Sequence, residues 1–143
     1  MDNLNAYQEE LSALDAQYQG VVDGASVKTL LFADRFPFRY LVDDYGLNYY
    51  AAFAGCSAET EASFETVVFL ANKVDELNLS SVLTIDNGDG KIANTIVENT
   101  AAKSAQILTL DSMQSVTLTD IENGATYLGG MEKNLEVLRE ALR

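Results

Sequence analysis

The sequence predicts an α/β fold of three layers, in which helices cover both faces of a four-stranded parallel sheet. Short apolar runs typical of buried strands alternate four times with amphipathic segments typical of helices. The connections between successive apolar runs are too long for hairpins, which favours right-handed crossovers between parallel strands. The predicted strands cover residues 27–33, 47–54, 81–85 and 105–110.

Length and composition fit one domain with a usable hydrophobic core. The chain has 143 residues, of which 48% are apolar, and it contains seven Tyr and six Phe. Its formal charge of -13, from 22 acidic and 9 basic residues, repels phosphate backbones and anionic lipid surfaces. We therefore expect no nucleic-acid binding and no binding to membrane surfaces, whereas cations and basic protein surfaces remain possible partners.

The chain contains no His and a single Cys, Cys56. This excludes Ser-His-Asp and Cys-His nucleophiles, zinc sites built on His, and thiolate clusters within the chain. Cys56 is expected to be a small buried hydrophobe. No apolar run approaches the ~20 residues that span a bilayer, so we expect no direct membrane insertion. No signal peptide opens the sequence, and we expect any export signal to lie outside this chain.

The N-terminal segment, residues 1–23, is predicted to be an amphipathic helix. Its apolar residues alternate steps of three and four, which gives a narrow seam suited to contact with one partner surface. This seam consists of Leu4, Tyr7, Leu11, Leu14, Tyr18 and Val21. The remainder, residues 24–143, is predicted to be the α/β domain.

The first strand leads into a charged corner and a helix, and the rest of the chain is organised around this stretch. Asp34 and Arg35 stand where the strand is expected to end. Pro37 suits the first turn of the following helix, because it lacks an N–H, and Gly46 is a typical helix stop. Further helices are predicted over residues 61–77, around residues 92–101, and from near Thr119 to the C-terminus. The spacing of Thr119 to Glu122 fits a capping box at the start of this last helix.

Carboxylates follow the predicted strands at or near each exit. The residues at these exits are Asp34, then Ser57 and Glu59, then Asp86, and finally Asp111. The carboxyl ends of parallel strands share one edge, which is where open α/β sheets bind ligands. One interpretation is that each Asp caps the next helix. The other is that some of these oxygens coordinate a divalent metal, alone or with ligands from elsewhere; oxygen ligands suit Mg, Ca or Mn better than Zn.

Paired carboxylates also serve as general acid and base in some enzymes, so an enzyme acting on a small cationic or metal-bound substrate is an alternative. Such an enzyme should show a closed pocket within this single chain that holds two acids with shifted pKa values. Half of a receptor should instead show an open, shallow, acidic face.

Several motifs, taken together in order and spacing, resemble the metal-binding (zinc- and manganese-type, cluster A-I) substrate-binding proteins of ABC importers. The resemblance runs from about Leu11 to the C-terminus. The motifs are Phe38-Arg39-Tyr40-Leu41, Asp44-Tyr45-Gly46-Leu47, residues 55–63, Ile85-Asp86, Leu110-Asp111-Ser112, and Tyr127-Leu128 with residues 131–135.

The resemblance implies that the chain is the C-terminal lobe of a two-lobed receptor, with residues 1–23 as the end of an interlobe helix. It implies capture of Zn or Mn between this lobe and an N-terminal lobe, delivery to a membrane ABC permease, no catalysis, and an extracytoplasmic location as a lipoprotein or periplasmic protein. The N-terminal lobe would supply two His ligands. By itself this chain is then expected to bind metal weakly or not at all.

In such a receptor this lobe supplies one ligand from its first corner and one from its last strand. Asp111 matches the second position, but the first falls on Arg35, which cannot coordinate a metal. Asp34 is the nearby substitute. We therefore expect Asp111 and Asp34 as metal ligands. Around them, the expected supporting residues are Arg35, Arg39, Glu59 and Asp86. The substitution by Arg35 leaves open a lobe that has lost metal binding.

Overall fold

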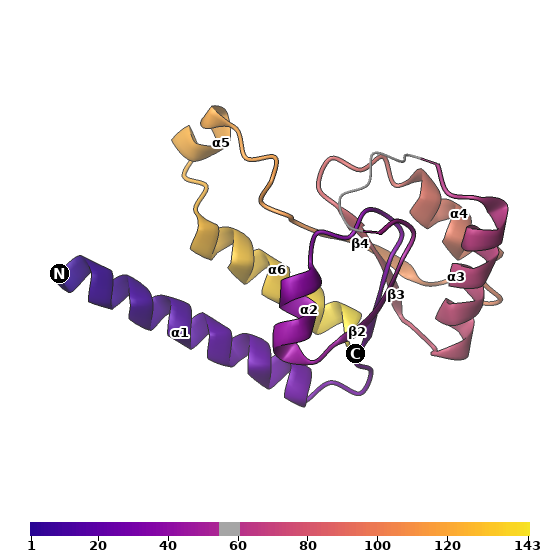
Figure 1. Ribbon diagram of the computed structural model, residues 1–143, viewed down its shortest axis with the longest axis horizontal. Coiled ribbons are helices and arrows are strands. Elements are labelled where there is room, and N and C mark those ends of the chain that lie inside the picture. The colour runs from indigo at the N-terminus through magenta and orange to yellow at the C-terminus, as the bar shows by residue number, and fades with distance from the viewer. Residues whose placement is uncertain (55–60) are drawn as a thin grey trace.

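The structure, a computed structural model, describes residues 1–54 and 61–143 and contains a four-stranded sheet between two layers of helices (Figure 1). The strand order is β2-β1-β3-β4, and each neighbouring pair runs parallel. This confirms the predicted α/β class and its three layers. The strands are β1 (Thr29–Phe32), β2 (Asn48–Ala51), β3 (Ser81–Ile85) and β4 (Gln106–Leu110).

The helices divide between the two faces of the sheet. They are α1 (Asp2–Asp23), α2 (Arg39–Tyr45), α3 (Phe64–Glu76), α4 (Lys91–Asn99), α5 (Leu118–Glu122) and α6 (Tyr127–Ala141). Successive side chains of β1 point to opposite faces, as in any strand. Leu30 and Phe32 join a core with α1, α2 and α6, whereas Leu31 and Ala33 join a core with α3 and α4.

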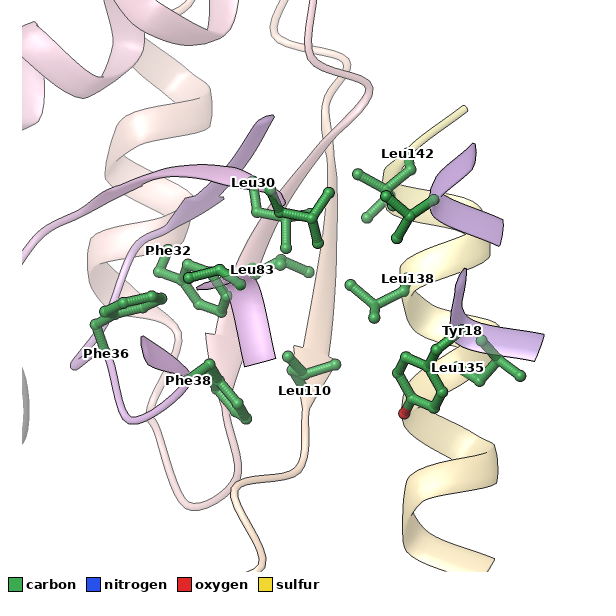
Figure 2. Close-up of a cluster of buried hydrophobic side chains, with 14 of the residues drawn as sticks. Tyr18, Leu30, Phe32, Phe36, Phe38, Leu83, Leu110, Leu135, Leu138 and Leu142 are labelled. Carbon is green, nitrogen blue, oxygen red and sulfur yellow. The ribbon is translucent and has the colours of Figure 1, made fainter. Parts of the chain in front are cut away.

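The first of these cores joins the sheet to the C-terminal helix. Figure 2 shows Leu138 of α6 pointing toward Leu83 of β3 and Leu110 of β4. Each of these leucines is almost fully buried, and burying one Leu side chain contributes about 1.5–3 kcal/mol. This packing fixes α6 against the strands whose ends carry Asp86 and Asp111.

The C-terminal half of α1 belongs to the same core. Leu14, Tyr18 and Val22 are buried, and the Tyr18 hydroxyl donates to the Met131 carbonyl oxygen at 2.5 Å. Burial of Tyr18 raises its pKa well above the ordinary value. The N-terminal half of α1 extends beyond the rest of the molecule, and Leu4 is exposed there (Figure 1).

Of the predicted seam of α1, Leu14 and Tyr18 are buried, Leu11 and Val21 are half-buried, and Leu4 and Tyr7 are exposed. No helix of the described residues is both long and apolar enough to cross a membrane.

The corner between β1 and α2 is built on aromatic packing. Phe36 stacks on Tyr49 with ring centroids 3.9 Å apart and meets Phe32 at 5.0 Å. The helix begins at Arg39, later than expected from Pro37, because the chain stays irregular while it buries Phe36 and its neighbours. Gly46 has φ 67°, which confirms it as the left-handed stop of α2.

The predicted last helix is wrong at its start. A short helix, α5, comes first, and its capping box joins Thr117 to Asp120 instead of Thr119 to Glu122. Gly124 then adopts φ 92°, a left-handed conformation that a helix cannot continue through. The long helix α6 restarts after Thr126, whose hydroxyl accepts from the Gly129 N–H.

Candidate functional site

The parallel sheet places Asp34, Asp86 and Asp111 at one edge. β1 ends at Phe32, two residues before Asp34, and β3 and β4 end directly before Asp86 and Asp111. In the strand order β3 lies between β1 and β4, so Asp86 lies between the other two corners. Adjacent strands are ~4.8 Å apart, which separates the ends of β1 and β4 by about 10 Å.

Asp111 is held through its backbone. The Asn134 side chain of α6 accepts from the Asp111 N–H at 2.8 Å and donates to the Asp111 carbonyl oxygen at 2.8 Å. The Asp111 carboxylate accepts the Met113 N–H on Oδ1 at 2.8 Å. Among the described residues no hydrogen bond or ion pair reaches Oδ2. A half-buried carboxylate with a fixed backbone and one oxygen left over is suited to bind a cation.

Asp86 instead organises the loop that follows β4. Its Oδ1 accepts the Ser112 N–H at 2.6 Å, and its Oδ2 accepts the Ser115 hydroxyl. Burial acts to raise the pKa of Asp86, but the hydrogen bonds from Ser115 and Ser112 outweigh it and hold the pKa below its ordinary value. Asp86 thus fixes the loop beside Asp111 while using both of its own oxygens.

Asp34 is enclosed by its neighbours. Its side chain is 14% exposed, and Oδ1 accepts the Arg35 backbone N–H at 2.8 Å. The Arg35 Nε lies 3.8 Å from the same oxygen. A methyl group added at Gly88 would lie 2.5 Å from Asp34 Oδ2, so the loop after β3 packs against this carboxylate. The loop after β3 therefore crowds one oxygen of Asp34, although Asp34 also lines a pocket of this edge.

Arg35 lies between two shallow pockets of this edge. A pocket of about 190 Å³ is lined by Asp34, Arg35 and the loop after β3, including Asp89. A second pocket of about 270 Å³ reaches from Arg35 across Asp86 to Ser115. The Arg35 side chain is 42% exposed, so its guanidinium is available to both pockets.

Another predicted supporting residue, Arg39, contacts α2 and β2. Arg39 pairs with Asp43 one turn along α2 at 2.8 Å and donates to the Tyr49 hydroxyl at 3.4 Å. The structure thus directs its guanidinium to α2 and β2, and no described contact joins it to Asp34 or Asp111. Ser57 and Glu59, together with Cys56, lie outside the described residues.

The site also depends on residues that sequence reasoning missed. Asn134 is 2% exposed, and Gly88 touches Asp34. A signal for Asn134 was available, because it interrupts the apolar face that Met131, Leu135 and Leu138 form on α6. A buried amide on such a face must find hydrogen-bond partners.

The edge has carboxylates but no complete metal site in the described part of the chain. Within residues 1–54 and 61–143, no three His, Cys, Asp or Glu side chains are grouped so that they can hold a metal ion. Asp111 and its neighbours can therefore contribute ligands, and a tight site needs further ligands from outside these residues.

The carboxyl groups of this edge whose pKa values are shifted do not suit acid catalysis. The pKa of Asp89 is lowered, chiefly by hydrogen bonds from Lys91, and that of Asp86 is lowered as well. A general acid that works near neutral pH needs a raised pKa. The two pockets of this edge are partly open to solvent.

Comparison with known proteins gives one consistent family. The family model described as "Zinc-uptake complex component A periplasmic" matches residues 1–141. The chain is similar to the zinc-binding lipoprotein AdcA of Streptococcus pneumoniae, with 30% identity over 138 residues, which is 96% of this chain and 26% of AdcA. It is also similar to the high-affinity zinc uptake system protein ZnuA of Bacillus subtilis, with 26% identity over 140 residues, which is 98% of this chain and 42% of ZnuA.

Solved structures agree with these relatives. The crystal structure of the Zn(II)-bound ZnuA-like domain of S. pneumoniae AdcA matches with a TM-score of 0.74 and 29% identity, covering 99% of this chain and 51% of that domain. The chain therefore spans about half of a related solved structure and less than half of the curated relatives. Together with the match over nearly its whole length, this shows that the chain belongs to the family of the periplasmic component A of zinc-uptake complexes.

Proposed function

We propose that this chain is the C-terminal lobe of the solute-binding protein of an ABC importer. The protein captures a divalent cation between this lobe and an N-terminal lobe and delivers it to a membrane permease, without catalysis. Family membership supports this role, and so does the share of the relatives that the chain spans. Relatives named as a lipoprotein and as a periplasmic component point to an extracytoplasmic location.

The geometry of the Asp111 corner gives the strongest structural support for this proposal. Asn134 fixes the backbone of Asp111 from both sides, and Oδ2 is free of described partners. The corner is preorganised to present one oxygen to a cation at an edge whose ligand set is incomplete. In this proposal Asp111 is a ligand and Asp34 is a weaker second one, tied to Arg35. Asp86 positions the loop beside the metal.

Zinc is the cation that the relatives favour. AdcA is named as zinc-binding, and its ZnuA-like domain was solved with Zn(II) bound. The carboxylates of this lobe alone suit Mn or Mg better, since zinc prefers nitrogen and sulfur ligands. Zinc capture therefore requires nitrogen ligands from the N-terminal lobe, and Mn is the cation expected if that lobe supplies few of them.

Isothermal titration with zinc tests the division of the site between lobes. The chain of 143 residues should show no submicromolar zinc binding, because it has too few ligands. The full-length product of the gene that encodes this chain should bind one zinc tightly. Tight one-to-one binding by this chain alone would overturn the division.

Substitutions in the full-length protein assign the ligands. Asp111→Ala should weaken zinc binding by more than about 100-fold, since loss of even a supporting residue around a metal typically weakens binding 10–100-fold. Asp34→Ala should have a smaller effect. Glu98→Gln, which removes one exposed charge from α4, is the control and should leave affinity unchanged. Equal effects of Asp111→Ala and Glu98→Gln would contradict the role of Asp111.

A second candidate is a lobe that no longer takes up metal, and Arg35 is the observation in its favour. A guanidinium beside the site repels a bare cation. Absence of zinc and manganese binding by the full-length protein is the result that would favour this candidate.

A further inference from the structure

One pocket of the carboxyl edge crosses three corners of the sheet, and we call it the three-corner groove. It is lined by Arg35 after β1, by Asp86 and Asn87 after β3, and by Ser112, Gln114 and Ser115 after β4. Its volume is about 270 Å³. The groove therefore runs from the Arg35 guanidinium to the loop that adjoins Asp111.

The Arg35 guanidinium gives the groove hydrogen-bond donors for an anionic ligand. A guanidinium carries five N–H donors. In the described part of the chain, Asp34 is the one carboxylate within 4.0 Å of it, at 3.8 Å from Nε, which is too long for a paired hydrogen bond. Asp86 is the acidic residue of the groove lining, and both of its oxygens already accept hydrogen bonds from Ser112 and Ser115. Asp86 keeps its negative charge, so the Arg35 guanidinium is the charged group of the groove lining with hydrogen-bond donors left for a ligand.

The backbone of Arg35 is also held in place before any ligand arrives. Its backbone N–H is fixed by Asp34, and the next residue, Phe36, is buried between Phe32 and Tyr49. A cationic side chain on a rigid corner loses less conformational entropy on binding than one on a mobile loop. Its planar guanidinium matches a carboxylate with two parallel hydrogen bonds.

From this geometry we infer that the three-corner groove binds the carboxylate group of a small ligand through Arg35, so that the cargo is a divalent cation already bound to a small carboxylate. The carboxylate satisfies the guanidinium, and the cation faces Asp111, which precedes Ser112 at the β4 end of the groove. The bound anion also screens the cation from Arg35. The cation half of this inference rests on the proposed function, whereas the carboxylate half concerns this chain alone.

Carboxylate binding is tested on this chain without metal. The chain, labelled with ¹⁵N, is titrated with sodium acetate against sodium chloride at a constant ionic strength of about 0.15 M, which screens the charge of -13 beyond ~8 Å. Acetate should shift the NMR signals of the Arg35 Nε–H and of the backbone N–H groups of Asn87 and Gln114. Arg35→Gln should abolish the acetate-dependent shifts.

Arg39→Gln is the matched control, because it removes an arginine that pairs with Asp43 on α2. It should leave the acetate-dependent shifts unchanged. Shifts that persist in Arg35→Gln, or that are absent from the unaltered chain, would overturn the inference whatever the full-length protein does with metal.

The full-length protein tests the complete cargo. Zinc affinity is measured with zinc alone and with zinc plus glycine, a small carboxylate that chelates zinc. Glycine should raise the apparent affinity at least tenfold in the unaltered protein and not in Arg35→Gln. Zinc binding without any effect of glycine would refute the inference and keep the proposed function. If acetate binds at Arg35 but the full-length protein binds no zinc, the proposed function and the cation half of the inference are refuted. The groove is then a site for a carboxylate alone.

Discussion

The Asp34 and Asp111 corners share one edge of the sheet and one local pattern, yet they differ in what they offer a ligand. In both, Oδ1 accepts a backbone N–H from one of the next two residues. Oδ2 of Asp34 then packs against Gly88, whereas Oδ2 of Asp111 meets no described partner. Position at the end of a strand brings a carboxylate to the site, and contacts from distant parts of the chain decide how much of it is left for a ligand.

The two corners are also fixed in different ways. Asp34 is held through its carboxylate, by Arg35 and by the loop after β3. Asp111 is held largely through its peptide groups, by Asn134 of α6. A carboxylate whose oxygens already hold neighbouring residues has less capacity left to bind a cation. A carboxylate whose backbone is held by hydrogen bonds keeps that capacity. Substitutions that weaken the contacts of each corner in turn should therefore have different effects.

Replacing Asn134 should have the largest effect. Asn134→Leu removes both hydrogen bonds to the Asp111 backbone, and leaving buried peptide groups unpaired costs about 1–3 kcal/mol each. We expect the free energy of unfolding to fall by about 2–4 kcal/mol in urea titrations. Lys133→Leu, exposed on the same helix, is the control and should change it little. A loss no larger than that of the control would show that Asn134 does not fasten this corner.

Gly88→Ala should have an intermediate effect and act on the other corner. The added methyl group would lie 2.5 Å from Asp34 Oδ2 and 3.2 Å from the Ile85 carbonyl oxygen, so the loop or the carboxylate must move. We expect a loss of about 1–2 kcal/mol, typical of overpacking.

Gly20→Ala is the matched control for the glycine substitution. Gly20 lies within α1, and no neighbouring atom comes within 4 Å of an added methyl group. It should stabilise the chain by about 0.5–1 kcal/mol, because Ala favours a helix over Gly. If Gly88→Ala leaves the free energy of unfolding unchanged, the loop after β3 does not pack closely against Asp34.

Much of the fold follows from local pattern in the sequence. Residues 81–85 are predicted as a strand and form β3 with the same bounds, and Gly46 ends α2 as expected. The start of the last helix was wrong because Thr117 with Asp120 and Thr119 with Glu122 have the same spacing. Spacing alone does not distinguish two candidate capping boxes in adjacent positions. The left-handed turn at Gly124 separates α5 from α6.

The position of the site could be predicted from the sequence, but the contacts within it could not. Strand ends and the parallel arrangement are enough to bring Asp34, Asp86 and Asp111 to one edge. The contact of Asn134 with Asp111 joins residues 23 positions apart. That of Gly88 with Asp34 depends on the pairing of β1 with β3. Such contacts arise from packing of whole elements, which periodicity does not describe.

Asp86→Asn should have the smallest effect, and its pH dependence identifies the cause. Hydrogen bonds from Ser115 and Ser112 hold the pKa of Asp86 below its ordinary value of 3.8 in the folded chain. A lowered pKa stabilises the fold above that ordinary value, and the stabilisation is lost as the pH falls through the folded value. Asn keeps one oxygen acceptor, so the loss at neutral pH should stay below about 1 kcal/mol.

The difference in urea midpoint between the unaltered chain and Asp86→Asn should therefore be constant above about pH 5 and shrink as the pH falls below 3.8. Ser115→Ala should reproduce part of this behaviour, since it removes one of the two hydrogen bonds. Glu98→Gln tests whether any loss of negative charge from this acidic chain has the same effect. A difference that grows toward low pH would show that the Asp86 carboxylate destabilises the edge, and the loop beside Asp111 would then need another fastening.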